Sequence, residues 1–530
     1  MMMPLQAPQL LTDPWLLQPT STSITVAWFT EFRGVKHRVI YGKGLEQRAT
    51  TIQLTRARED AQSRLDATLQ LTESPQLRLV WRHGATITGL VPGQKHSYYV
   101  ESIHEDGDVV QSRSFTLAPA PAMGTASKIL LTSDHQLKPM VAANLQKVME
   151  TIGPVDAIFY AGDLVNVPDR ASEWFDDVRG NAWFRCLQGR AEGKYRGGEL
   201  LQNAPIFTAV GNHEVMGRYS EHHSLHAQFK DPVPVSAAAQ QGPLRDQSFN
   251  TITYDEIFGS VDAPKYYAVT FGDVRLIVLY VANVFRSPAL TPATKGKYQE
   301  KEQDLSHPEQ WGYGQHIFES IAPDSPQYEW LQAELQSKAF QQAKYKIAMW
   351  HHPVHSLGGN VVPAYTDPVL VIDRDAAGQI RRVRYEYPKD ADYLMRDVLP
   401  LLEEAGVQLA LYGHCHLWNR FVSQAGTHYL ETSNVGNSYG AAVGDNRRIV
   451  PVTYRENYAA TGNPNGLEPV VPTIAPLKSL TGKPLPYIAS NNITVFTILD
   501  TGTSTISSYR FDTQKPEAPA LKFDEFPLLS

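Results

Sequence analysis

Two histidines one residue apart, in Gly413-His414-Cys415-His416, give the first indication of chemistry in this sequence of 530 residues. They follow the apolar run 408–412, which predicts a buried strand. Alternate side chains at the end of a strand point to the same side, so His414 and His416 converge while Cys415 turns away. Neutral imidazoles are among the commonest metal ligands. The pair alone is weak evidence, because two polar residues leaving a strand would look the same.

Four earlier apolar runs end in the same manner. The runs are 128–131, 156–160, 205–210 and 345–350, and the groups after them are Asp134, Asp163, Asn212 and His351. Each has a structural explanation when taken alone, as a helix cap, a turn residue or a strand-end histidine. In α/β layers, however, ligand sites lie off the carboxyl ends of strands. Five such endings in one sequence therefore favour a common site.

The combined set predicts a metal centre. Aspartate and histidine together suit Fe, Mn or Zn ions. The set is Asp134, Asp163, Asn212, His351, His414 and His416. These six groups are too many for one four-coordinate zinc and suit two metal ions with one bridging carboxylate. Two ions about 3.5–4 Å apart can activate a water and stabilise displacement at phosphorus. Glycines beside the ligands, Gly162, Gly211 and Gly413, would allow close backbone approach.

Two domains are expected around this centre. Residues 1–120 contain short β-rich runs separated by turn residues, which is typical of a β-sandwich. The Pro-rich stretch 119–126 reads as a linker, and from residue 127 to 530 strands, loops and helices alternate. We expect the charged residues 56–64 to form a solvated insertion.

Composition limits the kinds of partner. The net charge is -7 and no block of Lys or Arg occurs, so neither nucleic acid nor a membrane surface is an expected partner. No apolar run approaches the 18 or so residues of a membrane-spanning helix. Two cysteines exclude a disulfide framework. Residues 1–20 lack the pattern of a secretory signal, which makes a cytoplasmic location the expectation.

The ordered motifs resemble those of the calcineurin-like metallophosphoesterases. The motifs are Asp134, Gly162-Asp163, Gly211-Asn212-His213-Glu214, His351-x-Pro353 and Gly413-His414-x-His416. A fibronectin type III-like N-terminal domain, together with Gln327-x-x-Trp330-Leu331, makes the chain most similar to the purple acid phosphatase branch. One departure is His96, which stands where fibronectin type III domains usually have a corner tyrosine. The resemblance implies a four-layer α/β/β/α sandwich preceded by an all-β sandwich.

The resemblance also implies roles for individual residues. Asp134 and His416 would bind the first metal, and Asp163 would bridge both. Asn212, His351 and His414 would bind the second. His213 would contact the phosphate and protonate the leaving group as a general acid.

Two positions depart from the relatives. Asn166 stands where purple acid phosphatases carry a metal-binding tyrosine, so no purple colour is expected. Gln136 stands where other metallophosphoesterases carry a histidine. Gln136, Asn166 or water would complete the first metal shell, and the spacing favours Gln136. We also expect four polar residues to line the pocket and contact the substrate, namely His135, Asn166, His352 and His355. Each of them would equally fit an ordinary polar loop.

These expectations describe a hydrolase of small phosphate esters, a phosphomonoesterase in which a metal-bound hydroxide attacks phosphorus. The alternatives are a phosphodiesterase acting on nucleotides or lipid head groups, and a non-catalytic binding protein with a vestigial metal site. Retention of His213, His414 and His416 argues against the vestigial site. We expect three long loops to set the specificity of the site, namely 285–323, 357–390 and 437–482.

Overall fold

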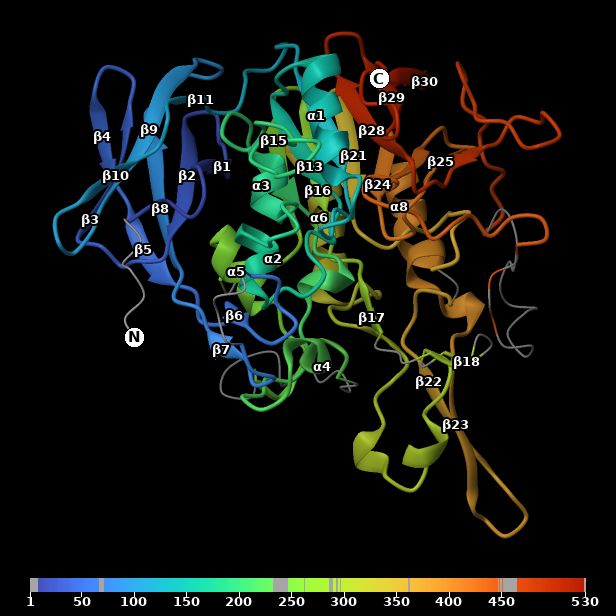
Figure 1. The fold of residues 1–530 in the computed structure, drawn as a ribbon. Coiled ribbons are helices and arrows are strands. Elements are labelled where there is room, and N and C mark those ends of the chain that lie inside the picture. The colour runs from blue at the N-terminus through green and yellow to red at the C-terminus, as the bar shows by residue number, and fades with distance from the viewer. Residues whose placement is uncertain are drawn as a thin grey trace.

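A β-sandwich at the N-terminal end lies beside a larger body of sheets and helices (Figure 1). The computed structural model describes residues 8–65, 71–231, 246–261, 263–285, 289–291, 294–295, 297–360, 363–446, 448, 450 and 465–528.

The N-terminal region is all-β, as the sequence predicted. One sheet has the order β1-β2-β8-β5, the other has β10-β9-β3-β4 with β11 beside β9, and β6 and β7 form a separate hairpin. The strands are β1 Trp15–Leu17, β2 Ser23–Thr30, β3 Lys36–Tyr41, β4 Leu45–Arg48, β5 Thr50–Gln53, β6 Arg58–Glu59, β7 Gln76–Leu77, β8 Trp81–Thr88, β9 His96–Ile103, β10 Val109–Gln111 and β11 Phe115–Leu117. Alternate residues of β9 are buried, and Tyr98 and Val100 meet Trp28 of the other sheet in a shared apolar core.

Two mixed sheets form the body. The six-stranded sheet runs β14 (Ile206–Thr208), β13 (Ala157–Tyr160), β12 (Lys128–Thr132), β28 (Ile493–Asp500), β29 (Thr505–Asp512) and β30 (Leu521–Pro527). The seven-stranded sheet runs β15 (Tyr267–Phe271), β16 (Val274–Val278), β21 (Tyr345–Met349), β24 (Leu409–Tyr412), β26 (His428–Thr432), β25 (Trp418–Val422) and β27 (Tyr487–Ile488). The strands β12, β13 and β14 are parallel, as are β16, β21, β24 and β26.

Apolar side chains of both sheets meet in one buried cluster, to which Leu131 and Phe159 contribute from the first sheet and Met349 and Leu411 from the second. Helices cover the other face of each sheet. Those packed against the six-stranded sheet are α1 (Val141–Ile152), α2 (Ala171–Phe175), α3 (Trp183–Leu187) and α5 (Ile252–Phe258). Those packed against the seven-stranded sheet are α6 (Pro326–Leu335), α7 (Lys338–Gln342) and α8 (Leu399–Glu404).

Two helices differ from the lengths expected from the sequence. The stretch 325–340 predicts one helix, but α6 and α7 are separate, because Ser337 accepts a hydrogen bond from the Phe340 N–H and begins a new helix. The stretch 392–405 also predicts one helix. It starts instead with a π-helical turn, Leu394–Val398, and continues as α8. The first turn of α8 contains a proline, which has no N–H to donate to the preceding turn.

The prediction that residues 56–64 form a solvated insertion is wrong for residues 57–60, which are buried, whereas Ala61, Gln62 and Arg64 are exposed. The residues Arg58, Glu59 and Asp60 are at most 4% exposed. They lie between the sandwich and the body, where Arg58 pairs with Asp169 and Asp60 pairs with Arg170 at 2.8 and 3.1 Å. The charged residues of this stretch predicted exposure to solvent, whereas Arg58 and Asp60 are paired with opposite charges of the body.

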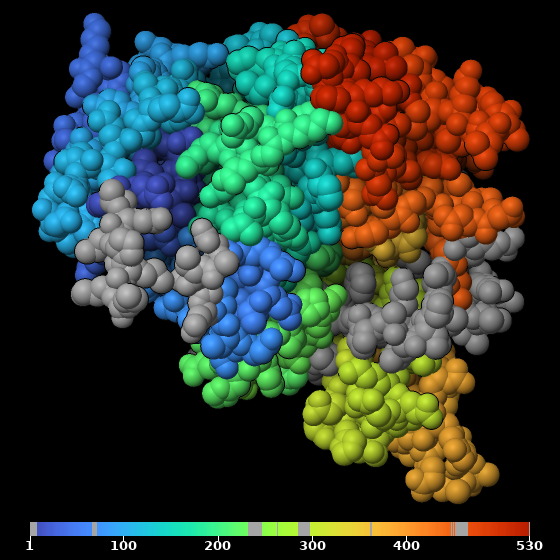
Figure 2. Space-filling view, in the orientation of Figure 1, coloured from blue at the N-terminus to red at the C-terminus, as the bar shows by residue number. Residues whose placement is uncertain are grey.

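The remaining elements lie around the edges of the body. They are α4 (Leu225–Phe229), β17 (Asn283–Phe285), β18 (Ala289–Thr291), β19 (Thr294–Lys295), β20 (Gln315–Ile317), β22 (Val369–Arg374), β23 (Ile380–Glu386) and 3₁₀ turns at Asn212–Glu214, Glu302–Asp304, Pro308–Gln310 and Lys389–Ala391. The β22–β23 hairpin stands out from the body, as Figures 1 and 2 show. In the described part of the chain, no helix has the length and apolar character needed to span a membrane.

Candidate metal centre

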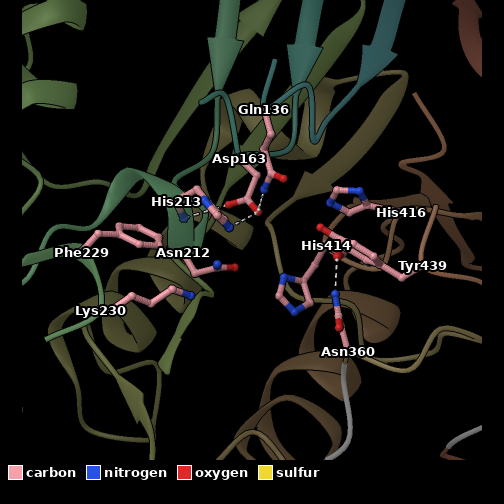
Figure 3. Close-up of a pocket in the computed structure, with 10 residues that line it drawn as sticks. All are labelled: Gln136, Asp163, Asn212, His213, Phe229, Lys230, Asn360, His414, His416 and Tyr439. Atoms are coloured by element: carbon pink, nitrogen blue, oxygen red, sulfur yellow. Dashed lines mark hydrogen bonds and ion pairs between the residues drawn. The ribbon is translucent and has the colours of Figure 1, made fainter. Parts of the chain in front are cut away.

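Five strands of the two sheets bring their carboxyl ends to one place. The turns after β12, β13, β14, β21 and β24 carry Asp134, Asp163, Asn212, His351 and His414. His416 follows two residues after His414, and Gln136 two residues after Asp134. All seven side chains are at most 6% exposed. Figure 3 shows several of them around a pocket of about 200 Å³.

Asp163 lies at the middle of the cluster, with its two oxygens facing different neighbours. Its Oδ1 lies 3.2 Å from His351 Nε2. Its Oδ2 accepts a hydrogen bond of 2.7 Å from Gln136 Nε2. One carboxylate therefore faces two sets of candidate ligands at once.

The candidate ligands divide into two groups. His351 Nε2 lies 3.2 Å from both Asn212 Oδ1 and His414 Nδ1. In the other group, His416 Nε2 lies 3.4 Å from Asp134 Oδ1. The resemblance assigned these two groups to two different metals, and that assignment stays a prediction.

Hydrogen bonds behind the rings fix which nitrogen faces the site. His351 Nδ1 lies 2.8 Å from the carbonyl oxygen of Ala161, so this nitrogen donates and Nε2 faces the other ligands. His416 Nδ1 lies 2.7 Å from Asn437 Oδ1, which leaves its Nε2 toward Asp134. Such partners set the tautomer and the ring orientation of metal-binding histidines.

The backbone at the ligands is held in a rare conformation. Positive φ angles occur at Asp134 (54°), Gln136 (42°), Asp163 (61°), His414 (80°) and His416 (55°). For residues other than glycine this region costs of order 1–3 kcal/mol each and is concentrated at functional sites.

Two glycines leave the space that this convergence needs. A Cβ atom at Gly211 would lie 2.3 Å from Asp163 Oδ1, and one at Gly413 would lie 2.3 Å from Asp134 Oδ2. Both distances are far inside van der Waals contact. Any side chain at either position would displace a candidate ligand.

Two buried glutamates hold the ligand-bearing turns. Glu214 accepts backbone N–H bonds from Asp163, Leu164 and Gly211 at 2.7–2.8 Å. The second glutamate, Glu431, accepts bonds from Cys415 N, Ser356 Oγ and Ser433 Oγ at 2.7–2.9 Å. Each glutamate fixes the turn that follows a central strand.

The pKa values of the clustered groups reflect their burial and their charged neighbours. Burial raises the pKa of Asp163, but the nearby imidazoles of His351 and His213 outweigh it and hold the pKa well below its usual value. Burial lowers the pKa of His414 well below its ordinary value, so this ring is neutral. Burial also lowers the pKa of His351, but the negative charge of Asp163 outweighs it and raises the pKa to about 10. A cation bound here would displace the His351 proton.

The donor set fits metal ions. Single ligand atoms of Asp134, Asp163 and His351 all lie within 4.8 Å of one another, and so do those of His351, His352 and His414. Asp134 Oδ1 is buried and accepts no hydrogen bond from the residues that the structure describes. An anionic oxygen that is buried in this way is compensated well by a bound cation.

His213, the predicted proton donor, lines the pocket. Its Nδ1 lies 2.7 Å from the carbonyl oxygen of Asn166, so Nδ1 donates and Nε2 is directed to the pocket side, 4.0 Å from Asp163 Oδ2. The ring packs against Phe229 with centroids 5.1 Å apart. Its side chain is 23% exposed, whereas the candidate ligands are buried.

Four residues expected to contact substrate do not line the pocket. His135 is buried against the Tyr160 ring, and its Nε2 bonds Thr132 Oγ1. His355 is buried between Phe421 and Tyr429. His352 lies behind the site, with its ring centroid 3.9 Å from that of His414. The fourth is Asn166, whose side-chain amide donates to the Gln136 carbonyl and accepts from Lys138.

The pocket has four lining residues that the sequence did not indicate, Phe229, Lys230, Asn360 and Tyr439. Asn360 and Tyr439 come from two of the long loops expected to set specificity. Asn360 Nδ2 donates to the His414 carbonyl, and the Tyr439 ring packs on His416 with centroids 4.5 Å apart. No periodicity or motif marked these positions, so no sequence signal was available to find them.

The chain was compared with known protein families, sequences and structures. A model of the calcineurin-like phosphoesterase family matches residues 127–417. In fold, the chain is similar to the purple acid phosphatase PPD1 from seeds of yellow lupin (Lupinus luteus), with a TM-score of 0.54 and 14% identity over 97% of this chain and 73% of that chain. A structure of PhoD aligns with a TM-score of 0.45 and 10% identity over 97% of this chain and 91% of that chain. No curated protein sequence matches the chain.

The family match spans more than half of the chain, and the chain therefore belongs to the calcineurin-like phosphoesterase family. It is a metal-dependent phosphoesterase, with buried aspartate and histidine groups that can hold a metal ion. The solved structures are too distant in sequence to add more than a likeness of fold.

Proposed function

We propose that the chain is a phosphomonoesterase that depends on two metal ions and hydrolyses small phosphate esters. The observation that carries this proposal is the placement of Asp163, whose two oxygens face the two groups of ligands. A carboxylate so placed suits a bridge between two ions. The pocket of about 200 Å³ suits a phosphoryl group with a compact leaving group.

The proposed ligand groups are those of the sequence prediction. One ion would be held by Asn212, His351 and His414, and the other by Asp134 and His416, with Asp163 shared. The side-chain oxygen of Gln136 would join the group of Asp134 and His416, because this amide lies beside Asp163, to which its Nε2 donates. Bound ions would supply an activated water and hold the phosphoryl oxygens.

The protein contributes a proton donor to this reaction. His213 Nδ1 is engaged by the Asn166 carbonyl, so only Nε2 faces the pocket. In its protonated form the ring would donate from Nε2 to the oxygen of the departing alcohol. Phe229 packs against the ring and limits its rotation.

The finer description of the fold is also a proposal. Helices on the outer faces of two packed sheets support the four-layer α/β/β/α arrangement for residues 127–530. The two sheets packed around Trp28 and Tyr98 support a fibronectin type III-like domain for residues 1–120. The lack of nucleic-acid and membrane partners and a cytoplasmic location stay predictions.

The test compares two substrates across pH after loading with Mn, Fe or Zn. We expect p-nitrophenyl phosphate to be hydrolysed faster than bis(p-nitrophenyl) phosphate. A faster diester would favour the phosphodiesterase alternative. No hydrolysis of either ester, together with less than one metal ion per chain, would contradict the proposal.

His213→Ala tests the proton donor. We expect turnover to fall about 10²–10⁴-fold with metal content retained. His104→Ala is the matched control, because His104 has a similar exposure, 26%, and lies in the N-terminal sandwich. If His213→Ala lost metal instead, its role as a proton donor would be wrong.

A further inference from the structure

Lys230 is a cationic side chain that lines the metal pocket and that the ligand assignment does not use. It follows directly after α4, whose last residue, Phe229, packs against His213. In Figure 3 the Lys230 side chain extends below Asn212 with its amino nitrogen toward the pocket. Among the described residues that line the pocket, Lys230 is the single lysine or arginine.

The N-terminal domain holds the first turn of α4. The backbone N–H of Leu225, the first residue of the helix, donates to Asp60 Oδ2 at 2.7 Å. Asp60 is fully buried and also pairs with Arg170 of the body. A negative charge at this end of a helix complements the helix dipole.

A second contact joins the same helix to the β6–β7 hairpin. Arg58 Nη2 donates to Gln228 Oε1 of α4 at 2.9 Å and pairs with Asp169 at 2.8 Å. The side chains of Arg58, Asp169 and Gln228 are at most 4% exposed. Figures 1 and 2 show this hairpin beside α4.

An ion pair also joins the residues on either side of α4. Arg218 and Asp231 form two hydrogen bonds of 2.6 and 2.7 Å. The helix is short, five residues, and would be marginal alone. Leu225 and Phe229 pack against Val167 and Met216 of the body. The buried polar contacts of Arg58 and Asp60 add to this packing in fixing the position of the helix and of Lys230.

The charge of the substrate gives this lysine a specific effect. A monoester dianion carries one more negative charge than a diester and has one more unsubstituted oxygen. A lysine ammonium binds such an oxygen by a charge-assisted hydrogen bond. A second ester group would remove both the charge and the acceptor.

We propose that Lys230 binds an unsubstituted phosphoryl oxygen and gives the site its preference for monoester dianions, with Asp60 and Arg58 of the N-terminal domain as positioning residues. This inference rests on the proposed phosphatase function. It also assigns a task to the N-terminal sandwich, which holds one wall of the active site.

The test substitutes Lys230→Met in the full-length, metal-loaded protein. We expect kcat/KM for p-nitrophenyl phosphate to fall about 10- to 100-fold, and that for bis(p-nitrophenyl) phosphate to change less than about threefold. Lys515→Met is the matched control, since Lys515 is 75% exposed and far along the chain on a C-terminal turn. Equal losses for both esters, or no loss for either, would overturn the inference.

Asp60→Asn tests the positioning by the N-terminal domain. We expect the ratio of monoester to diester kcat/KM to fall about 3- to 10-fold, and to fall no further in Asp60→Asn combined with Lys230→Met than in Lys230→Met alone. Gln228→Met, on α4 itself, serves as a second perturbation if Asp60→Asn does not fold. Additive losses, or an unchanged ratio, would show that Asp60 does not act through Lys230.

Binding of inorganic phosphate separates this inference from the phosphatase proposal. We expect phosphate to bind the metal-loaded protein about tenfold more weakly in Lys230→Met than in the native protein. Weaker binding without hydrolysis of either ester would leave the role of Lys230 supported and the phosphatase function contradicted. Equal phosphate binding would contradict the role of Lys230.

Discussion

Replacement of Glu214 by glutamine is the sharpest test of how the ligand turns are held. The carboxylate is fully buried, with Oε2 accepting from Asp163 N and Gly211 N and Oε1 accepting from Leu164 N. Burial and the negative charge of Asp163 raise the pKa of Glu214 to about 8, while the three N–H donors favour the ionised form. Glutamine keeps the shape but has a single acceptor oxygen.

The magnitude follows from the three bonds. If the glutamine oxygen accepts from Asp163 N and Gly211 N, its NH₂ group faces the buried N–H of Leu164. One buried N–H without a partner costs about 1–3 kcal/mol. Because the turn carries the bridging candidate Asp163, we expect the cost to appear as metal affinity weakened about 10- to 100-fold.

The assay is a chelator competition that measures the metal dissociation constant of the native protein and of Glu214→Gln. Glu221→Gln is the matched control, because Glu221 lies exposed on the loop that follows. Thermal unfolding of the metal-free proteins in chelator measures the effect of the lost hydrogen bond on stability. We expect a lower midpoint for Glu214→Gln and an unchanged midpoint for Glu221→Gln. A dissociation constant within twofold of the native value, with an unchanged midpoint, would refute this reasoning.

Three further predictions concern the first metal, its colour and acid stability. Gln136→His should tighten binding of the ion held by Asp134 and His416 about tenfold in a metal titration, because imidazole is a stronger ligand than an amide oxygen. Unchanged affinity would mean that Gln136 is not a ligand. The iron-loaded protein should lack an intense visible band that vanishes on reduction, since Asn166 replaces the tyrosine; such a band would contradict the assignment. Burial lowers the pKa of His83 in the sandwich to about 2, so the folded state disfavours the protonated ring. The free energy of unfolding therefore has its full value above pH 6.5 and decreases as the pH falls below 6.5. This decrease reaches about 3 kcal/mol at pH 4.5. In His83→Gln the free energy of unfolding should depend less on pH in this range, and the pH midpoint of acid unfolding should be lower. An unchanged midpoint would contradict the lowered pKa of His83.

Regular patterns explain which features the sequence predicted. Apolar runs marked the strands that end at Asp134, Asp163 and His351, because strand burial leaves a local signal. The parallel strands then brought the following residues together, as expected of α/β layers. Helix α1 was equally clear, since its apolar positions recur at helical spacing.

Features that depend on distant contacts left no such signal. In the charged run 56–64, Arg58 and Asp60 are buried because Asp169 and Arg170 lie opposite them in space. The same holds for Lys230, whose position depends on Asp60, 170 residues earlier in the chain. His135 illustrates the reverse case. It stands between two site residues in sequence, yet its backbone turns the ring into the core beside Tyr160.

The metal content of the active protein tests the central claim most directly. Metal-free protein is titrated with Mn or Zn while bound ions and hydrolysis of p-nitrophenyl phosphate are measured on the same samples. We predict two ions per chain, with the group of Asn212, His351 and His414 filled first and activity rising with the second ion. Full activity with a single ion per chain, or with none, would contradict the account.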